Sequence, residues 1–159
     1  MEFSEIVKTF TTAVEKNDGE KLASMFTVDG VYDDYIYGEF KGRRNIAMML
    51  PTHFHRDAKN FSWEMYDLIN NDSKGYARYR FSFTSTLTGS KNLKVAVPGM
   101  AYFQFDGNLI EYYGEVVNGG IPMAQLNLPS KKIKRVFEKW SERALEADPK
   151  LRNLYKKGE

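Results

Sequence analysis

The chain has 159 residues, a length typical of one domain with a single hydrophobic core. It is 42% hydrophobic and 14% aromatic, as expected of a globular protein, and it contains no cysteine. Disulfides, a thiolate nucleophile and zinc sites of the cysteine type are therefore excluded. The net charge of +2 is unevenly spread, because residues 119–159 carry ten Lys and Arg against five Asp and Glu.

The first ten residues, MEFSEIVKTF, are acidic and amphipathic, and they lack the basic start and apolar core of a secretion signal. No stretch approaches the roughly 20 apolar residues that a membrane span needs. The basic tail has neither interleaved aromatic residues nor a nucleic-acid-binding motif. We therefore expect a cytoplasmic protein that binds neither membranes nor nucleic acids.

Two helices are predicted at the start of the chain. Apolar residues recur at helical spacing over residues 6–14, and the turn at residues 17–19 ends this first helix. Asp18 is the expected N-cap of a second, short helix, because an aspartate there accepts a hydrogen bond from an unpaired backbone N–H. The apolar pattern extends this second helix to Met25 and Phe26.

A mixture of strands and one further helix follows. Residues 30–40, GVYDDYIYGEF, are predicted to form a strand or a bent hairpin. A third helix is predicted over residues 43–56, and Pro51 should kink or shorten it. Another strand, over residues 60–69, ends in the polar turn at residues 70–73.

Three consecutive antiparallel strands are predicted over residues 76–87, 93–105 and 109–117. In the middle one, valine, alanine and phenylalanine alternate with lysine, tyrosine and glutamine, which is the period of a strand with one apolar face. Asp106-Gly107 is a strong hairpin signal between the last two strands. The sheet is therefore expected to have an apolar face that lines a cavity.

The end of the chain is predicted to be helical. Apolar residues from Ile133 to Leu145 form one stripe that includes Phe137 and Trp140, as in an amphipathic helix. Asp148-Pro149 should cap and begin a last short helix. We expect a domain over residues 1–120 and a helical extension over residues 121–159, which packs on the same domain or on a dimer mate.

Four segments carry a resemblance to a known family. The order and spacing of NDGEKLASMFTVDGVYDD, FKGRRNI, RYRFSFTSTLTG and VPGMAYFQFDGNLIEYYGEV resemble the SnoaL-like branch of the nuclear-transport-factor-2-like superfamily, a relative of ketosteroid isomerase. The resemblance covers roughly residues 4–118. It implies an α+β fold in which a cone-shaped, curved antiparallel sheet wraps the N-terminal helices and leaves an apolar pocket. It also implies a homodimer that pairs through the outer face of the sheet.

The resemblance also implies proton transfer without a cofactor. Asp34 matches the general base of the isomerase by its place before the Lys41-Gly42-Arg43 turn. Alternation sends Asp33 and Asp34 to opposite faces, so they do not share a proton. Burial beside aromatic side chains would raise the pKa of the inward carboxylate. The alternative, in which both are solvated acids at a strand end, stays open here.

The partners of the base depart from the family pattern. The oxyanion tyrosine of the isomerase corresponds to Phe10, and its second oxyanion acid to Ala101, or to Met100 in a register shifted by one. The acid on the last strand of limonene-epoxide-hydrolase-like relatives corresponds best to Gly114. None of these side chains donates a hydrogen bond, so Tyr32, Tyr112 or a histidine would have to serve.

The expected pocket wall combines aromatic and aliphatic residues with a few polar ones. His53 and His55 lie about 200° apart around the predicted helix, so they cannot hold one metal ion together, and no metal site is expected. Either histidine could still hydrogen-bond into the pocket, although a surface position is the simpler interpretation. The binding residues we expect are Phe10, Phe26, Tyr32, Met49, His53, Phe81, Phe83, Val97, Ala101, Phe103 and Tyr112.

On the other face of the sheet, Arg78 and Arg80 could pair with Glu64 or Glu111 across neighbouring strands. Salt bridges there, or a dimer interface, are expected rather than an anion-binding site.

Three functions are open at this point. The first is a cofactor-independent lyase or isomerase that acts on a small apolar or aromatic molecule, with Asp34 as general base. The second is a non-catalytic ligand-binding protein, and the third is a dimeric scaffold like the transport factor itself. Fold resemblance alone cannot choose among them.

Overall fold

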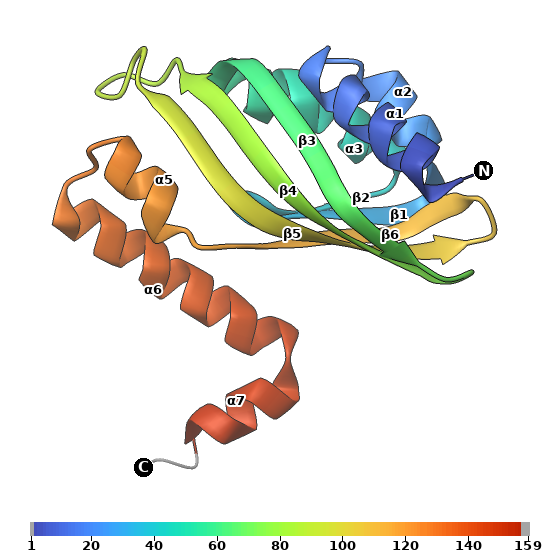
Figure 1. Cartoon of the computed structure of the whole chain (residues 1–159). Helices are drawn as coiled ribbons and strands as arrows, with labels where there is room; N and C mark the ends of the chain where they lie inside the picture. Colours follow the sequence, from blue (N-terminus) through green and yellow to red (C-terminus); the bar gives the residue numbers. More distant parts are fainter. Residues whose placement is uncertain (1, 157–159) are drawn as a thin grey trace. The chain divides into compact units, whose positions relative to one another are not determined.

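The computed structural model describes residues 2–156, which form two compact units, residues 2–126 and 127–156. The first unit has the predicted α+β fold, built on one curved six-stranded sheet (Figure 1). Its strands lie in the order β2-β1-β6-β5-β4-β3. Neighbouring strands are antiparallel except β1 and β6, which are parallel. The strands are β1 (Phe26–Asp34), β2 (Gly38–Lys41), β3 (Ala58–Asn70), β4 (Lys74–Ser85), β5 (Lys94–Asp106) and β6 (Leu109–Val117).

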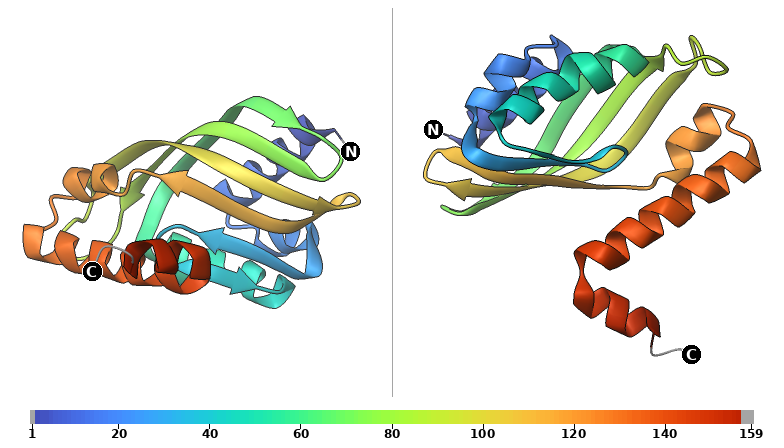
Figure 2. Two further views of the ribbon diagram at one scale, coloured as in Figure 1. Left: turned by 90° about the horizontal axis from the view of Figure 1, so that it is seen from below. Right: turned by 180° about the vertical axis from the view of Figure 1, so that it is seen from behind.

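The N-terminal helices lie on the concave side of this sheet (Figures 1 and 2). The predicted N-cap is confirmed, because Asp18 Oδ1 accepts a hydrogen bond of 3.0 Å from the Lys21 N–H. The second helix ends earlier than predicted, since Phe26 begins β1 and its buried ring packs against Phe10. The helices are α1 (Phe3–Glu15), α2 (Gly19–Ser24), α3 (Arg43–Met49), α4 (His55–Asp57) and α5 (Gly120–Gln125).

The predicted irregularity at Pro51 takes the form of a wider helical turn. Residues Leu50–Phe54 form a π-helical segment between α3 and α4. Proline has no N–H to donate and its ring collides with the preceding turn, so the backbone widens there instead of continuing an α-helix.

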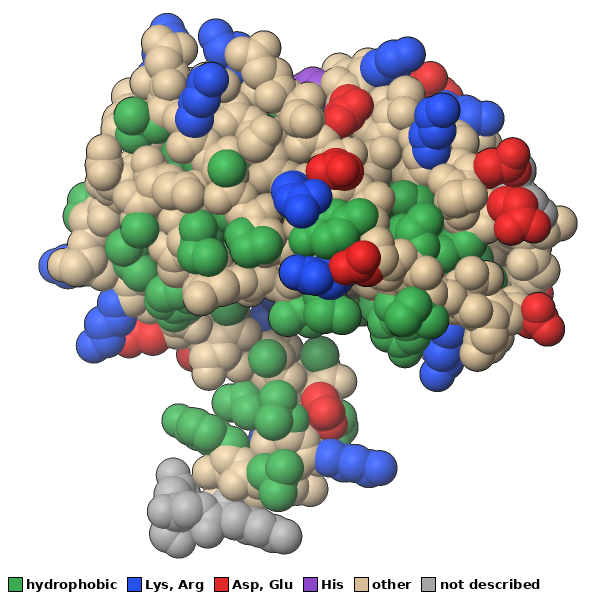
Figure 3. Space-filling view, in the orientation of Figure 1, with side chains coloured by type: hydrophobic (Ala, Val, Ile, Leu, Met, Phe, Trp, Pro, Cys, Tyr) green, Lys and Arg blue, Asp and Glu red, His purple; other side chains and the backbone are tan. Residues whose placement is uncertain are grey.

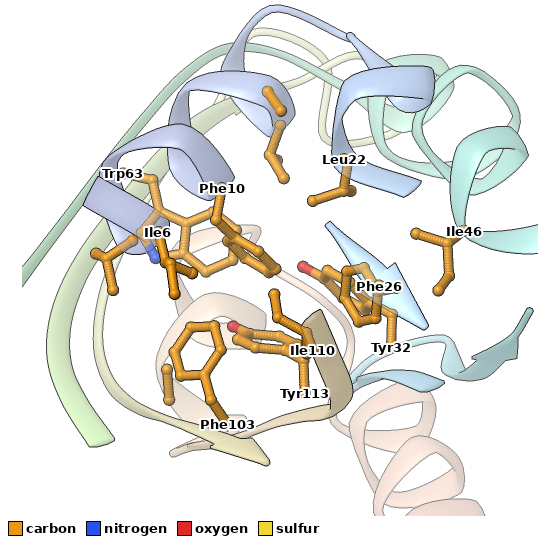
Figure 4. Packing of buried hydrophobic residues seen from close by; sticks show 14 of the residues in the cluster. Ile6, Phe10, Leu22, Phe26, Tyr32, Ile46, Trp63, Phe103, Ile110 and Tyr113 are labelled. Atoms are coloured by element: carbon orange, nitrogen blue, oxygen red, sulfur yellow. The ribbon is translucent and has the colours of Figure 1, made fainter. Parts of the chain in front are cut away.

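The concave face is filled at its closed end by packed aromatic rings (Figure 4). The Phe10 ring of α1 lies at the centre, and the centroids of five neighbouring rings lie 4.6 to 6.3 Å from its own centroid. Aromatic pairs at such separations stabilise the fold by more than the burial of their surface alone. The core therefore ties α1 to four strands through one side chain, whose ring neighbours are Phe26, Tyr32, Trp63, Phe103 and Tyr113.

Salt bridges cross the convex face of the sheet, as predicted. Arg80 pairs with the expected Glu64 at 3.0 Å, whereas Arg78 pairs at 3.0 Å with Asp67, which was not among the expected partners. The register of β3 shifts between Tyr66 and Ile69, and this irregularity brings Asp67 to the arginine. Figure 3 shows Lys or Arg and Asp or Glu side chains lying together on this face among hydrophobic ones.

The C-terminal helix of the first unit completes the edge of the sheet. β6 ends at Val117, which pairs with Gly99, so beyond that point β5 has a strand neighbour, β4, on one side alone. The side chain of Gln125 in α5 takes the place of a strand there. It accepts a hydrogen bond of 2.8 Å from the Ala96 N–H and donates one of 3.0 Å to the Ala96 carbonyl.

The second unit consists of α6 (Ser130–Ala147) and α7 (Pro149–Lys156). Asp148 caps α7 as predicted, because its Oδ1 accepts hydrogen bonds from the N–H groups of Lys150 and Leu151. Phe137 and Trp140 contact each other on the apolar stripe of α6, with ring centroids 5.5 Å apart. Docking of this stripe on the domain or on a dimer mate stays a prediction. No helix within residues 2–156 is both long and apolar enough to cross a membrane.

Phe10→Ala should lower the free energy of unfolding by about 3–5 kcal/mol, because it leaves a cavity among five aromatic rings. Urea denaturation followed by circular dichroism measures this change. Leu87→Ala is the control, since Leu87 is exposed and its removal should change stability by less than about 0.5 kcal/mol. Equal effects of the two substitutions would contradict the central role of Phe10.

Candidate functional site

The last two residues of β1 are acidic and point to opposite faces of the sheet, as alternation predicted. Asp33 lies on the convex face, where its Oδ2 accepts a hydrogen bond of 2.7 Å from the Tyr112 hydroxyl. Asp34 is buried, with only 5% of its surface exposed. The interpretation of both residues as solvated acids is therefore wrong for Asp34.

The chain turns after Asp34, and this turn holds the carboxylate in place. Asp34 Oδ1 accepts hydrogen bonds of 2.9 Å from the Ile36 N–H and of 2.7 Å from the Tyr37 N–H. Hydrogen bonds from backbone N–H groups stabilise the ionised form of a carboxyl group. The turn thus gives Asp34 a fixed position at the concave face.

A second acid, Glu115, lies beside Asp34. Because β1 and β6 are parallel and Asp33 pairs with Gly114, the next residues along the two strands are Asp34 and Glu115. Sequence reasoning missed Glu115, since the resemblance placed the acid of the last strand at Gly114. Alternation was the available signal, because Glu115 lies two residues after the buried Tyr113 and so shares its face.

Two tyrosine hydroxyls hold the Glu115 carboxyl group. Tyr79 and Tyr113 both donate to its Oε2, at 2.9 and 3.0 Å. Tyr79 reaches it by crossing over Gly99 of the neighbouring strand. A Cβ atom at Gly99 would lie 2.2 Å from Cζ of the Tyr79 ring, so only glycine leaves room for this path.

Burial and a neighbouring charge keep Glu115 protonated near neutral pH. The residue as a whole retains some exposed surface, but its carboxyl group is enclosed. This enclosure, followed by the negative charge of Asp34, raises the pKa of Glu115 to about 8. Hydrogen bonds from Tyr79, Tyr113 and the Tyr35 backbone act in the opposite direction and are outweighed.

The tyrosines around Glu115 remain phenols at physiological pH. Burial first, and then the negative charge that Glu115 carries above its own pKa, raise the pKa values of Tyr32, Tyr79 and Tyr113 above their ordinary value. The Tyr32 hydroxyl points into the cone (Figure 4). It has no hydrogen-bond partner within residues 2–156 that meets ordinary geometry, although Tyr113 is its neighbour. The concave site therefore combines the buried carboxyl group of Asp34, a neutral Glu115 and several neutral phenol donors.

The structure places the expected binding residues in three regions. The first is the closed end of the cone, where side chains have little or no exposed surface and form part of the core. These residues are Phe10, Phe26, Tyr32, Met49, Ala101 and Phe103. Of this set, Tyr32 has an electrostatic interaction with both acids, and Ala101 pairs directly with Glu115 across β5 and β6.

The second region is the wider part of the concave face. Phe81 and Phe83 are partly exposed and stack with Phe61, and Val97 pairs with Phe81 on the neighbouring strand. Tyr112 belongs to the third region, the convex face, where it is bonded to Asp33. The structure therefore does not bring Tyr112 to the side of Asp34.

The two histidines lie apart, as their spacing predicted. His53 is partly exposed, and its ring contacts those of Tyr37 and Phe40. His55 Nε2 donates a hydrogen bond of 2.7 Å to the Val14 carbonyl, and its ring packs on Phe61. His55 thus fastens the helical segment to the end of α1.

The sequence profile of the SnoaL-like domain matches residues 7–113. The chain belongs to the SnoaL-like family. None of the curated proteins is significantly similar to it in sequence. The SnoaL-like fold is shared with many solved structures, and three of them indicate its range.

The first is a hypothetical protein with a ketosteroid isomerase-like fold from Catenulispora acidiphila, in complex with trimethylamine. It has a TM-score of 0.71 and 20% identity over 80% of this chain and 95% of that chain. The second is a candidate SnoaL-like polyketide cyclase from Shewanella putrefaciens, with a TM-score of 0.67 and 15% identity over 79% and 96% of the two chains. The third is an epoxide hydrolase like limonene-epoxide hydrolase from M. tuberculosis, with a TM-score of 0.61 and 16% identity over 77% and 86%. Identities this low establish the shared fold alone.

The raised pKa of Glu115 makes the stability of the SnoaL-like domain pH-dependent. Between the ordinary value of 4.5 and about 8, the unfolded chain releases the Glu115 proton while the folded chain keeps it. The free energy of unfolding should therefore fall as the pH rises through this window. Urea titrations at pH 5, 6, 7 and 8 measure the fall, and Glu115→Gln should flatten it. The same slope in both proteins would show that Glu115 is ionised in the folded state.

Gly99→Ala should displace the Tyr79 ring and remove its hydrogen bond to Glu115, because the added methyl group would collide with the ring. A loss of roughly 1–3 kcal/mol in the free energy of unfolding is expected for such overpacking. Met100→Ala, at an exposed position on the other face of the same strand, is the control. An unchanged stability of Gly99→Ala would mean that the ring takes another path.

Proposed function

We propose that this SnoaL-like domain binds a small apolar or aromatic molecule in its cone and moves a proton on it without a cofactor, as a lyase or isomerase. Asp34 is the general base in this proposal. The supporting observation is the pair of acids at the ends of β1 and β6, which have different environments. Pairs of acids whose surroundings separate their pKa values are suited to acid and base roles in one reaction.

Asp34 is suited to accept a proton because it is buried and its Oδ1 accepts hydrogen bonds from two backbone N–H groups, which favour a carboxylate. A carboxylate withdrawn from water is a stronger base than a solvated one. The fixed turn also orients it toward the concave face, where Tyr32 and Glu115 interact with it.

Glu115 is suited to the opposite role. A carboxyl oxygen has two lone pairs, and both lone pairs of Oε2 are engaged by the hydroxyls of Tyr79 and Tyr113. In this proposal the proton of neutral Glu115 lies on Oε1, which then acts as an O–H donor. Such a donor stabilises negative charge that develops on an oxygen atom of the ligand. Glu115 would supply the hydrogen bond that Phe10 and Ala101 cannot.

The comparisons support a small-molecule role without identifying the molecule. One structural neighbour was solved in complex with trimethylamine, and another is a candidate polyketide cyclase. Phe61, Phe81 and Phe83 provide partly exposed aromatic surface on the concave face, which favours a flat apolar ligand.

A second candidate function is ligand binding without turnover. It is favoured by the side chains at Phe10, Ala101 and Gly114, where the resemblance expects donors or acids and this chain has none. Both candidates use the concave site. Homodimer formation through the convex face stays a prediction.

5-Nitrobenzisoxazole tests the proposed chemistry, since a base removes its ring C–H proton, the N–O bond breaks and a coloured phenolate forms. The proton would pass to Asp34, and the new oxygen anion would meet the Oε1–H group of Glu115. Asp34→Asn should lower kcat/KM by roughly 100-fold or more. Glu115→Gln should also lower it, by up to roughly 100-fold.

Asp33→Asn is the matched control, because it alters the neighbouring acid on the opposite face and should leave kcat/KM unchanged. A wild-type rate no higher than that of Asp34→Asn would contradict the enzymatic proposal. Quenching of tryptophan fluorescence by 4-nitrophenol, without turnover of the benzisoxazole, would then support the ligand-binding alternative.

A further inference from the structure

We propose that Tyr37 and Asp57 are positioning residues for the two acids of the concave site, and that they act by fixing the turn at residues 35–37. This inference rests on the proposed function, since it assigns further residues to the same proton transfer. The turn joins β1 to β2, the strand at one edge of the sheet, and Ile36 within it is exposed.

The turn directs three successive backbone N–H groups at the two acids. Those of Ile36 and Tyr37 donate to Asp34 Oδ1, at 2.9 and 2.7 Å. The backbone of Tyr35 donates to the carboxyl group of Glu115. A displacement of this turn would therefore disturb both acids at once.

The hydrogen bonds to Asp34 are local. Donor and acceptor lie two and three positions apart in the chain, so these bonds fix the carboxyl group relative to its own turn. They do not fix the turn relative to the rest of the cone. β2 has four residues and lies at the edge of the sheet, and segments of this kind open locally more easily than a central strand does. A connection to another element would keep the turn in place.

The side chain of Tyr37 makes this connection. Its hydroxyl donates a hydrogen bond of 2.7 Å to Oδ2 of Asp57, a residue 20 positions further along the chain. Its ring packs on those of His53 and Phe54, with centroids 5.1 and 5.7 Å from its own. Tyr37 therefore binds Asp34 through its backbone, and it contacts α4 and the preceding π-helical segment through its side chain.

The acceptor of this hydrogen bond is an ionised carboxylate. Arg56 donates to both oxygens of Asp57, at 2.6 and 2.8 Å. Hydrogen bonds from Arg56, and then from Tyr37, hold the pKa of Asp57 below its ordinary value, although burial acts in the opposite direction. A hydrogen bond to a charged acceptor is stronger than one between neutral groups. Tyr37 is thus held more firmly than a neutral partner would hold it.

Asp57 is itself fixed to the sheet by Thr86, which directly follows β4. The Thr86 N–H donates to the Asp57 carbonyl at 2.9 Å, and the Thr86 hydroxyl donates to the Arg56 carbonyl at 2.8 Å. A series of hydrogen bonds therefore leads from the end of β4 through Asp57 and Tyr37 to Asp34.

Tyr37→Phe tests the proposal, because it removes the hydroxyl and keeps the ring. Hydrogen exchange of the backbone N–H groups at positions 36 and 37, followed in ¹H–¹⁵N NMR spectra of the full chain, measures how often the turn opens. Both groups should exchange roughly 10-fold faster or more, as expected when a hydrogen bond to a charged group is lost. Exchange at the buried residues Ala77 and Phe103, in central strands of the sheet, should stay unchanged.

Tyr112→Phe is the matched control. It also removes a tyrosine hydroxyl that donates to an aspartate at 2.7 Å, but this aspartate is Asp33 on the opposite face. Exchange at positions 36 and 37 should therefore not change in this variant. Asp57→Ala should accelerate exchange there as Tyr37→Phe does, and the double variant should show no further acceleration, because both substitutions remove the same contact.

The benzisoxazole reaction gives a second measurement. Tyr37→Phe should lower kcat by roughly 10-fold and change KM by less than about twofold, because a displaced base slows proton transfer while the aromatic wall that binds the ligand stays intact. A role in folding alone would change neither constant once the protein is folded.

Unchanged exchange at positions 36 and 37 in Tyr37→Phe would overturn the proposal. Equal acceleration at Ala77 and Phe103 would overturn it too, since the variant would then have lost global stability and not the anchor of one turn. An unchanged kcat would count in the same way if Asp34→Asn is inactive. If the wild-type protein shows no turnover, the proposed function fails, and the exchange rates alone decide whether Tyr37 and Asp57 fix the turn.

Discussion

Two carboxyl groups held side by side away from bulk water cannot both be ionised at neutral pH, and this repulsion defines the concave site. The turn after Asp34 directs two N–H groups at its carboxyl group, and such hydrogen bonds favour the ionised form. Glu115 keeps its proton because it is enclosed and because Asp34 is charged. The two acids therefore differ because backbone N–H groups surround Asp34, whereas Glu115 is enclosed and lies beside a negative charge.

Much of the fold could be predicted because periodicity is a local property of the sequence. The three long strands from β4 to β6, the hairpin at Asp106-Gly107 and the caps at Asp18 and Asp148 all follow from the residues that form them. The apolar face of β5 also follows, since Ala101 and Phe103 alternate with polar neighbours. The opposite orientations of Asp33 and Asp34 could be predicted from this period of two alone.

The site could be predicted only in part, because it depends on pairing between distant strands. Local patterns contain no sign that β1 pairs in parallel with β6, and this pairing alone sets Asp34 beside Glu115. The register shift near Phe105 and Ile110 likewise interrupts simple alternation before Tyr112. The route of Tyr79 over Gly99 requires a three-dimensional contact that no spacing rule describes.

The parallel pairing of β1 with β6 also determines when the site can form. Asp33 and its partner Tyr112 are separated by 79 positions in the chain, and β6 has to enter between β1 and β5 to bring them together. Contacts of such long range are slow to form, since most of the loop-closing entropy is lost first. During synthesis on the ribosome, the helices and the β3–β5 meander can assemble while Asp34 is still in water. The last strand to emerge is therefore the one that brings Glu115 beside Asp34, so a chain that ends before β6 lacks this pair of acids.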